Sequence, residues 1–126
     1  MIHYLFAILI SHFPQDTSIN DSIKIEGFDC RMWKTDSLGC QKKRYKIWQL
    51  IYDNRERVIG QRRCAIEQLL GPPNTTSDTE KTAFYFLSTG LQCSKENKIP
   101  YRDIEVFKLG VTYKDSIAID VFTMIP

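Results

Sequence analysis

The sequence has only two histidines, His3 and His12, and both lie within the first twelve of its 126 residues. No Cys–His pair or Ser–His–Asp triad can therefore be built from the rest of the chain. The four cysteines lack Cys-x-x-Cys spacing, which disfavours a zinc site. A hydrolase that uses two carboxylates stays open, although no pair stands out among the 15 Asp and Glu side chains. We expect a non-catalytic protein without a metal or other cofactor.

Long apolar runs are also absent, and the longest, residues 1–10, is too short to span a bilayer. Its length and apolarity suit the apolar region of a secretory signal, although no Lys or Arg precedes it and no lipobox cysteine follows. We expect residues 1–13 to be a signal or an apolar N-terminal segment, and residues 14–30 to be a polar linker or extended arm. The expected location is the periplasm, the outer envelope or the extracellular space. The alternative is a buried or amphipathic segment of a cytosolic domain.

The net charge of +2 hides an uneven distribution. Residues 1–30 carry −3, residues 31–63 carry +7, and residues 64–126 carry −2. The basic third indicates the solvated face of a helix, or a docking face for an acidic partner or an anionic lipid surface. Few aromatic residues interleave with these charges, so nucleic acid is not an expected partner. The basic side chains are Lys42, Lys43, Arg44, Lys46, Arg55, Arg57, Arg62 and Arg63.

Two helices are predicted before residue 72. Apolar residues recur at helical spacing between Tyr45 and Ile59, which predicts a helix over residues 38–56 with Thr35 or Asp36 as its N-cap. A second helix is predicted over residues 62–70, with Ile66, Leu69 and Leu70 as its buried stripe. Gly71 and then Pro72-Pro73 end it.

The sequence after residue 73 predicts strands and loops. Residues 74–80 form a polar loop, 82–88 a strand, and 89–100 a second loop. Strands over 104–113 and 117–122 are expected to form a hairpin, with Ile117, Ile119 and Val121 on one face. Helices followed by strands predict a single α+β domain over residues 31–126, with two helices on one face of a three-stranded antiparallel sheet.

The opposite face of that sheet is the first candidate for an interaction surface. We expect Tyr85 and Phe122 to lie on this face, where exposed apolar side chains would bind a partner. The alternative is that the N-terminal arm covers it. Lys42, Lys43 and Lys46 on the first helix form the second candidate surface.

The pattern Ile59-Gly60, Ile66, Leu69-Leu70-Gly71 and Pro73 resembles the second-helix signature of the BamE-like (SmpA/OmlA-type) family. Further residues resemble small exported proteins and lipoproteins of Bacteroidetes type, and the whole resemblance covers about residues 28–123. Arg62 departs from the pattern, because the family usually has Ser or Thr there to cap the second helix. The residues of the shared motif are Trp33, Asp36, Gly39, Cys40, Arg44, Gly60, Gly71, Pro73, residues 84–86 and Cys93.

The resemblance implies an α-α-β-β-β fold, which is also found as a tandem repeat in β-lactamase inhibitor proteins. It implies an adaptor of the cell envelope that contacts another protein, and it brings no catalytic residues. The alternative function is a secreted inhibitor or immunity-type protein that blocks one enzyme. A small envelope hydrolase is the third hypothesis.

Four cysteines allow three disulfide connectivities. The resemblance implies a bond between Cys40 and Cys93. On the second helix Cys64 lies about 160° from Ile66, away from the buried stripe, so it can meet Cys30 if the arm crosses this helix. The alternative is four reduced thiols in a cytosolic protein.

Overall fold

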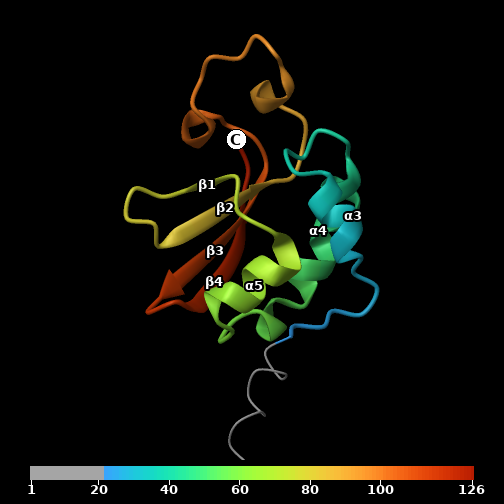
Figure 1. Cartoon of the computed structure of the whole chain (residues 1–126), viewed down its shortest axis with the longest axis vertical. Coiled ribbons are helices and arrows are strands. Elements are labelled where there is room, and N and C mark those ends of the chain that lie inside the picture. The colour runs from blue at the N-terminus through green and yellow to red at the C-terminus, as the bar shows by residue number, and fades with distance from the viewer. Residues whose placement is uncertain (1–21) are drawn as a thin grey trace, which may run out of the picture.

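The computed structural model describes residues 22–126, which form an α+β fold with three α-helices and a four-stranded antiparallel sheet (Figure 1). The predicted signal segment 1–13 and the first part of the expected arm lie outside the described residues. The helices are α3 (Cys30–Thr35), α4 (Lys43–Asp53) and α5 (Arg63–Leu70), with short 3₁₀ turns η1 (Arg55–Arg57), η2 (Leu91–Cys93) and η3 (Tyr101–Asp103). The strands are β1 (Thr75–Thr76), β2 (Thr82–Phe86), β3 (Lys108–Lys114) and β4 (Ile117–Met124), and they lie in this order across the sheet.

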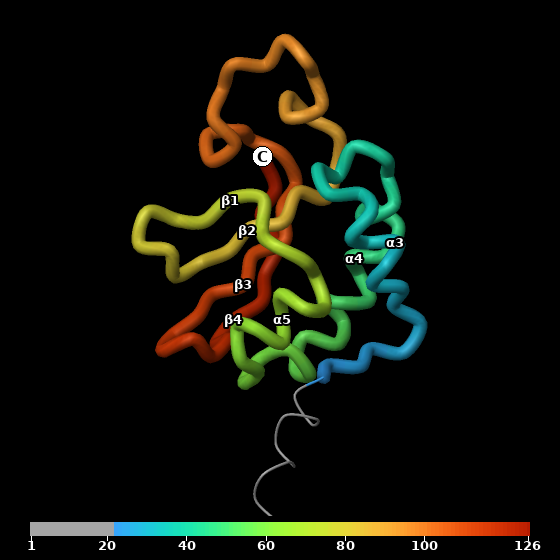
Figure 2. Tube along the Cα trace, viewed as in Figure 1, coloured from blue at the N-terminus to red at the C-terminus, as the bar shows by residue number. Residues whose placement is uncertain are grey.

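The helices form one layer against one face of the sheet, and the core lies between the two layers (Figure 2). The described part of the arm belongs to this side, because Ile25 is buried in the core and Phe28 packs against it. The described arm residues therefore do not cover the opposite face of the sheet. The largest fully buried apolar side chains of the core are Trp33, Tyr85, Ile51, Ile66, Leu70, Leu87, Leu109, Val58 and Val111.

The first predicted helix is shorter than expected, and α3 before it was not predicted. Gly39 and Lys42 adopt left-handed backbone conformations with φ of +74° and +65°, so residues 36–42 form a loop. Asp36 does not directly precede α4. Its carboxylate nonetheless accepts hydrogen bonds from the amides of Lys43 and Arg44 at 2.9 and 3.1 Å. It therefore satisfies free donors at the start of this helix from across the loop.

The second predicted helix is confirmed as α5, which ends at Gly71 with φ of +78°. Its N-cap, Arg62, makes no capping hydrogen bond with its side chain. The amide of Arg63 instead donates to the carbonyl of Ser116, in the β3–β4 turn, at 2.8 Å. The hairpin thus replaces the capping side chain that Arg62 does not supply.

The sheet has one strand more than predicted. In the segment expected to be a loop, Thr75 and Thr76 pair with Phe84 and Ala83 to form the edge strand β1. A register shift between β3 and β4 leaves Ile119 unpaired and 51% exposed, while Ala118 and Val121 reach the core. The predicted alternation through Ile119 is therefore wrong, because a β-bulge shifts which residues face inward.

Arg44 joins the helical layer to the sheet. Its guanidinium donates to the carbonyl of Trp33 at 3.1 Å, to Asn74 Oδ1 at 2.9 Å and to the carbonyl of Phe86 at 3.4 Å. It also lies over the rings of Trp33 and Tyr85, 4.7 and 5.8 Å from their centroids. Burial lowers the pKa of Arg44 to about 10, against the opposing effect of the Asp36 carboxylate, so Arg44 is charged at neutral pH.

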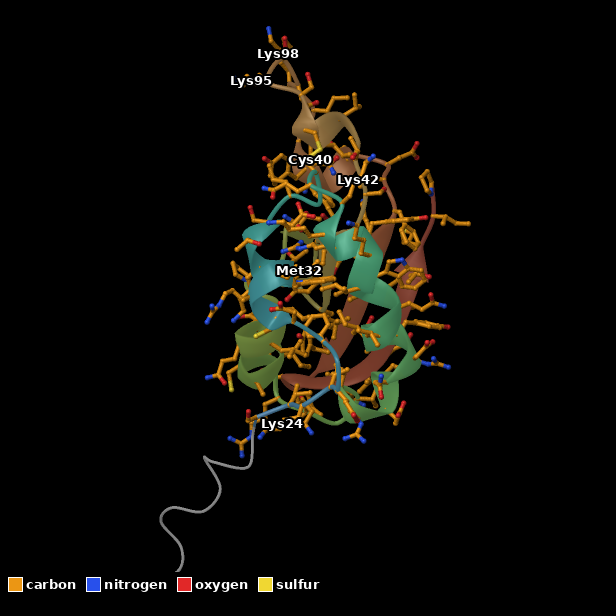
Figure 3. All side chains as sticks on the ribbon, turned by 90° about the vertical axis from the view of Figure 1, so that its right-hand side faces the viewer. Lys24, Met32, Cys40, Lys42, Lys95 and Lys98 are labelled. Atoms are coloured by element: carbon orange, nitrogen blue, oxygen red, sulfur yellow. A yellow bond between two sulfur atoms is a disulfide. The ribbon has the colours of Figure 1, made fainter. Side chains whose placement is uncertain are left out.

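The segment between β2 and β3 folds back over one end of the sheet's other face. A small second core there consists of Phe86, Ile104 and Val106, and the Tyr101 ring contacts Phe86 edge-on at 5.7 Å. For this reason β3 begins at Lys108 rather than at residue 104. A disulfide between Cys40 and Cys93 ties the segment to the α3–α4 loop, as the resemblance implies. Figure 3 shows Cys40 at the base of the segment and Lys95 and Lys98 at its tip.

The predicted second disulfide is wrong, because Cys30 and Cys64 are both exposed free thiols. Cys30 lines a hollow with Ala65, Gln68 and Leu69. The start of α3 therefore lies beside the middle of α5, whereas Cys64 lies nearer the start of that helix.

Gly39 should be the least replaceable of the motif glycines. A Cβ at Gly39 would lie 2.7 Å from the carbonyl oxygen of Phe86, whereas a Cβ at Gly60 would meet nothing within 4 Å. Both positions have positive φ, so Gly60→Ala should cost about 1 kcal/mol of unfolding free energy from backbone strain alone. Gly39→Ala should cost about 2 kcal/mol more, because of the added clash. Equal losses for the two variants in urea denaturation would contradict this packing.

The Cys40–Cys93 bond should contribute much of the net stability. The two residues are 53 positions apart, a loop whose closure is worth about 4 kcal/mol in the chain-entropy model. The Cys40→Ser/Cys93→Ser variant should lose a stability of this order in chemical denaturation. The matched Cys30→Ser/Cys64→Ser variant should unfold like the native chain, and a comparable loss in both variants would refute the assignment.

Candidate interaction surface

The face of the sheet opposite the helices, here called the outer face, consists of three rows of side chains from β2, β3 and β4. Antiparallel partners lie directly opposite each other and point to the same side of a sheet. The rows are Thr82–Thr112–Asp120, Phe84–Gly110–Phe122 and Phe86–Lys108–Met124. Within residues 22–126, no α-helix covers these rows (Figure 1), and Met124 is 44% exposed.

The middle row is organised around a glycine. A Cβ at Gly110 would lie 2.4 Å from an atom of the Phe122 ring, so this ring lies directly over the glycine backbone. Phe84 meets the Phe122 ring edge-on, with centroids 6.1 Å apart. An aromatic ring over a strand glycine replaces the missing side chain and fixes the ring on the sheet. Phe122 therefore lies on the expected face, half-buried and rigidly placed.

Tyr85, the other aromatic residue expected on this face, lies on the core side instead. It is buried between Phe84 and Phe86, which point outward, and its hydroxyl donates to the carbonyl of Gly71 at 2.9 Å. Burial raises the pKa of Tyr85 above its usual value. The prediction for Tyr85 is therefore wrong, because strand alternation places it with Ala83 among the core residues.

Lys108 was not predicted as a site residue. In the structure it is a buried charged residue, with an exposed fraction of 8%. Its ammonium lies 5.5 Å from the centroid of the Phe84 ring and 5.9 Å from that of Phe86. Burial lowers the pKa of Lys108, and the carboxylates of Glu105 and Asp103 oppose this effect only in part. The segment between β2 and β3, residues 87–107, folds back so that Asp103 lines the same cleft as Lys108. A lysine in a predicted strand gives no local signal that such a segment will lie beside it.

A cleft of about 430 Å³ lies beside this ammonium. Its polar walls come from β1, the β1–β2 turn and η3. Arg102 bridges two of the walls, 3.2 Å from Asp78 and 3.9 Å from Asp103. The lining residues are Thr75, Thr76, Ser77, Asp78, Phe84, Arg102, Asp103 and Lys108.

The basic residues of α4, the second candidate surface, do not form one patch with the other cations of the segment. Lys42 and Lys46 are exposed, and Lys43 is half-buried and contacts the Thr35 hydroxyl at 3.4 Å. Arg44 is buried in the interlayer contact described above. Arg55 lies over the Tyr52 ring at 4.3 Å. The basic residues of 31–63 thus make several separate contacts and do not form one continuous basic surface.

An aromatic strip also runs along α4, where Trp48 contacts Phe107 at 5.1 Å and Tyr52 at 6.3 Å between ring centroids. Tyr45 extends the strip and is largely exposed. Aromatic residues are enriched in protein interfaces, whereas lysines are depleted there. The sequence pattern did not distinguish this exposed strip from the core, because its residues recur at the same helical spacing as the buried residues.

Among residues 22–126, no group of three or more His, Cys, Asp or Glu side chains is arranged to hold a metal ion. No helix in the same range is long and apolar enough to cross a membrane. Comparison of the chain with protein-family models, curated protein sequences and solved structures gave no match. The resemblance to the BamE-like family therefore stays a prediction.

The charge of Lys108 should lower the stability of the folded protein. Lys108→Met keeps the length of the side chain and its contact with the two rings but removes a desolvated charge, so unfolding free energy at pH 7 should rise by about 1 kcal/mol. Because the folded pKa is lowered, this gain should shrink as the pH rises toward 10.5, where the unfolded lysine also loses its proton.

The matched control is Lys114→Met, because Lys114 lies on the same strand but is exposed. Its stability should stay within about 0.5 kcal/mol of the native chain. A loss of stability in Lys108→Met would show that the ammonium has a stabilising partner.

Proposed function

We propose that this protein is a non-catalytic binding module of the cell envelope that contacts another protein through the outer face of its sheet. The observation that carries the proposal is the one-sided cover of the sheet: three helices pack on one face, and the 87–107 segment covers only one end of the other. Phe84, Phe122 and Met124 stay at the surface there. Apolar side chains on a rigid sheet face suit a protein interface.

The cysteines support a place outside the reducing cytosol. Disulfides persist in the periplasm and in secreted proteins, and Cys40–Cys93 is compatible with export. The apolar residues 1–10 agree with this proposal as a sequence feature. A BamE-like adaptor role, attached to other envelope proteins, is the form of the function that the sequence resemblance favours.

A secreted inhibitor that blocks one enzyme is the alternative function, and it would use the same surface. The aromatic pair Phe84 and Phe122 favours it, because aromatic anchors dominate the energy of tight interfaces. The two functions differ in the partner: an adaptor joins an assembly of envelope proteins, whereas an inhibitor abolishes the turnover of a single enzyme. Contact of Lys42 and Lys46 with an anionic membrane surface is a further proposal for the helical side.

Site-specific crosslinking in the native host tests the proposed surface. A photoreactive phenylalanine analogue at Met124 or Thr112, on the outer face, should give one discrete protein adduct. The same analogue at Lys24, on the arm that packs with the helical layer (Figure 3), should give none. Mass spectrometry of the adduct, with an activity assay if it is an enzyme, separates the adaptor from the inhibitor.

Adducts formed from Lys46 on α4 but not from Met124 or Thr112 would contradict the proposed surface. They would assign binding to the aromatic strip and the lysines of the helix. The same result with anionic phospholipid as the only crosslinked species would contradict a protein partner.

A further inference from the structure

We propose that the cleft beside Lys108 is a binding site for a carboxylate group. The inference goes beyond the proposed function, because it concerns the chemistry of the cleft and holds whether or not a protein docks on the rest of the outer face.

The direction of the Lys108 side chain is the first argument. Lys108 is on β3, but its ammonium lies over two rings of β2, so the side chain leans across the sheet toward the edge strand β1. Thr75 of β1 lies opposite Phe84 and lines the cleft together with Lys108. The ammonium therefore lies on the side of β3 that faces the cleft.

The unused hydrogen-bonding capacity of the cleft is the second argument. Within the described part of the chain, the Lys108 ammonium forms no hydrogen bond or ion pair, and Lys108 as a residue is 8% exposed. Its nitrogen is not one of the fully buried unpaired atoms, so it keeps some contact with solvent. A largely buried charge is normally paired, and two aromatic faces replace only part of its lost hydration. The hydroxyl of Thr75, which points to the same side of the sheet as Phe84, likewise has no hydrogen-bond partner among residues 22–126. The ammonium and this hydroxyl thus lack an acceptor, which a bound oxyanion would supply.

The charge balance of the cleft is the third argument, and it selects the kind of anion. Arg102 is already shared between Asp78 and Asp103, which leaves Lys108 as the lining cation without an ion-pair partner in the described structure. Two cations and two carboxylates give the lining a formal charge of zero, and Glu105 is a further carboxylate near Lys108. These carboxylates repel any anion, but they repel a singly charged carboxylate less than a phosphate dianion, so Lys108 can neutralise only the former. Phe84 adds an apolar wall for the carbon atoms next to the carboxylate.

The size of the cleft fits such a ligand. A volume of about 430 Å³ lies within the usual range of roughly 300–1,000 Å³ for small-molecule sites. It can hold a small organic acid or the glutamate side chain of a peptide. Both sources present the same group to Lys108, and the experiment separates them.

Titration of the isotope-labelled, disulfide-bonded chain followed by amide NMR tests the proposal at pH 7. The probes are acetate, an N-acetylated and C-amidated Ala-Glu-Ala peptide, the matching Ala-Gln-Ala peptide, and inorganic phosphate. The glutamate peptide should give saturable shifts at Thr75, Thr76 and Phe84. The glutamine peptide should bind at least about tenfold more weakly, because a charge-assisted hydrogen bond is lost. Saturation by acetate at equal concentration would assign the site to a free acid, and tighter binding of the peptide would assign it to a peptide side chain.

Two variants make the result specific to the ammonium. Lys108→Met should weaken binding of the glutamate peptide by at least about tenfold, whereas Lys114→Met should leave it unchanged. Equal binding of the two peptides, unchanged binding by Lys108→Met, or saturation by phosphate at lower concentration than by acetate would overturn the proposal. Absence of binding here leaves the crosslinking result at Met124 and Thr112 to be judged by itself, so the two proposals fail separately.

Discussion

The rest of the structure depends on one buried cation, the guanidinium of Arg44. It contacts the carbonyls of Trp33 and Phe86 and the side chain of Asn74, which belong to the helical layer, to β2 and to the turn before β1. A buried guanidinium is tolerated only where its donors are used, and here carbonyl and amide oxygens and aromatic faces surround it. The position of α4 against the sheet is thereby fixed by directional bonds in addition to apolar packing.

This arrangement decides which side of the sheet is left for binding. The helices, the arm from Ile25 onward and the Arg44 contact close one face. The 87–107 segment, held by Cys40–Cys93, covers Phe86 at one end of the other face and forms a wall of the cleft beside Lys108. The disulfide therefore supports both the fold and the proposed site. The rows through Phe122 and Met124 remain at the surface, where a partner can reach them.

The sequence predicted features that depend on local chemistry and missed those that depend on distant contacts. The end of α5 at Gly71 follows from backbone conformation, and the order of helices and strands follows from periodicity. The two-residue strand β1 and the bulge at Ile119 depend on their partners across the sheet. The face of Tyr85 is an exception, because it follows from local strand alternation and was nonetheless misassigned. The burial of Lys108 was not foreseen, because residues 87–107 fold back over this end of the sheet. The outer face itself was predicted, but its cleft was not.

Counting thiols on the protein isolated from its native host tests most directly whether it is a disulfide-locked module outside the reducing cytosol. Intact mass is measured after alkylation without reduction and again after reduction. The structure predicts two labelled cysteines, Cys30 and Cys64, in the first sample and four in the second. Four labelled cysteines before reduction would mean that the 87–107 segment is not tied down in the cell, and would contradict both the proposed location and the locked cleft.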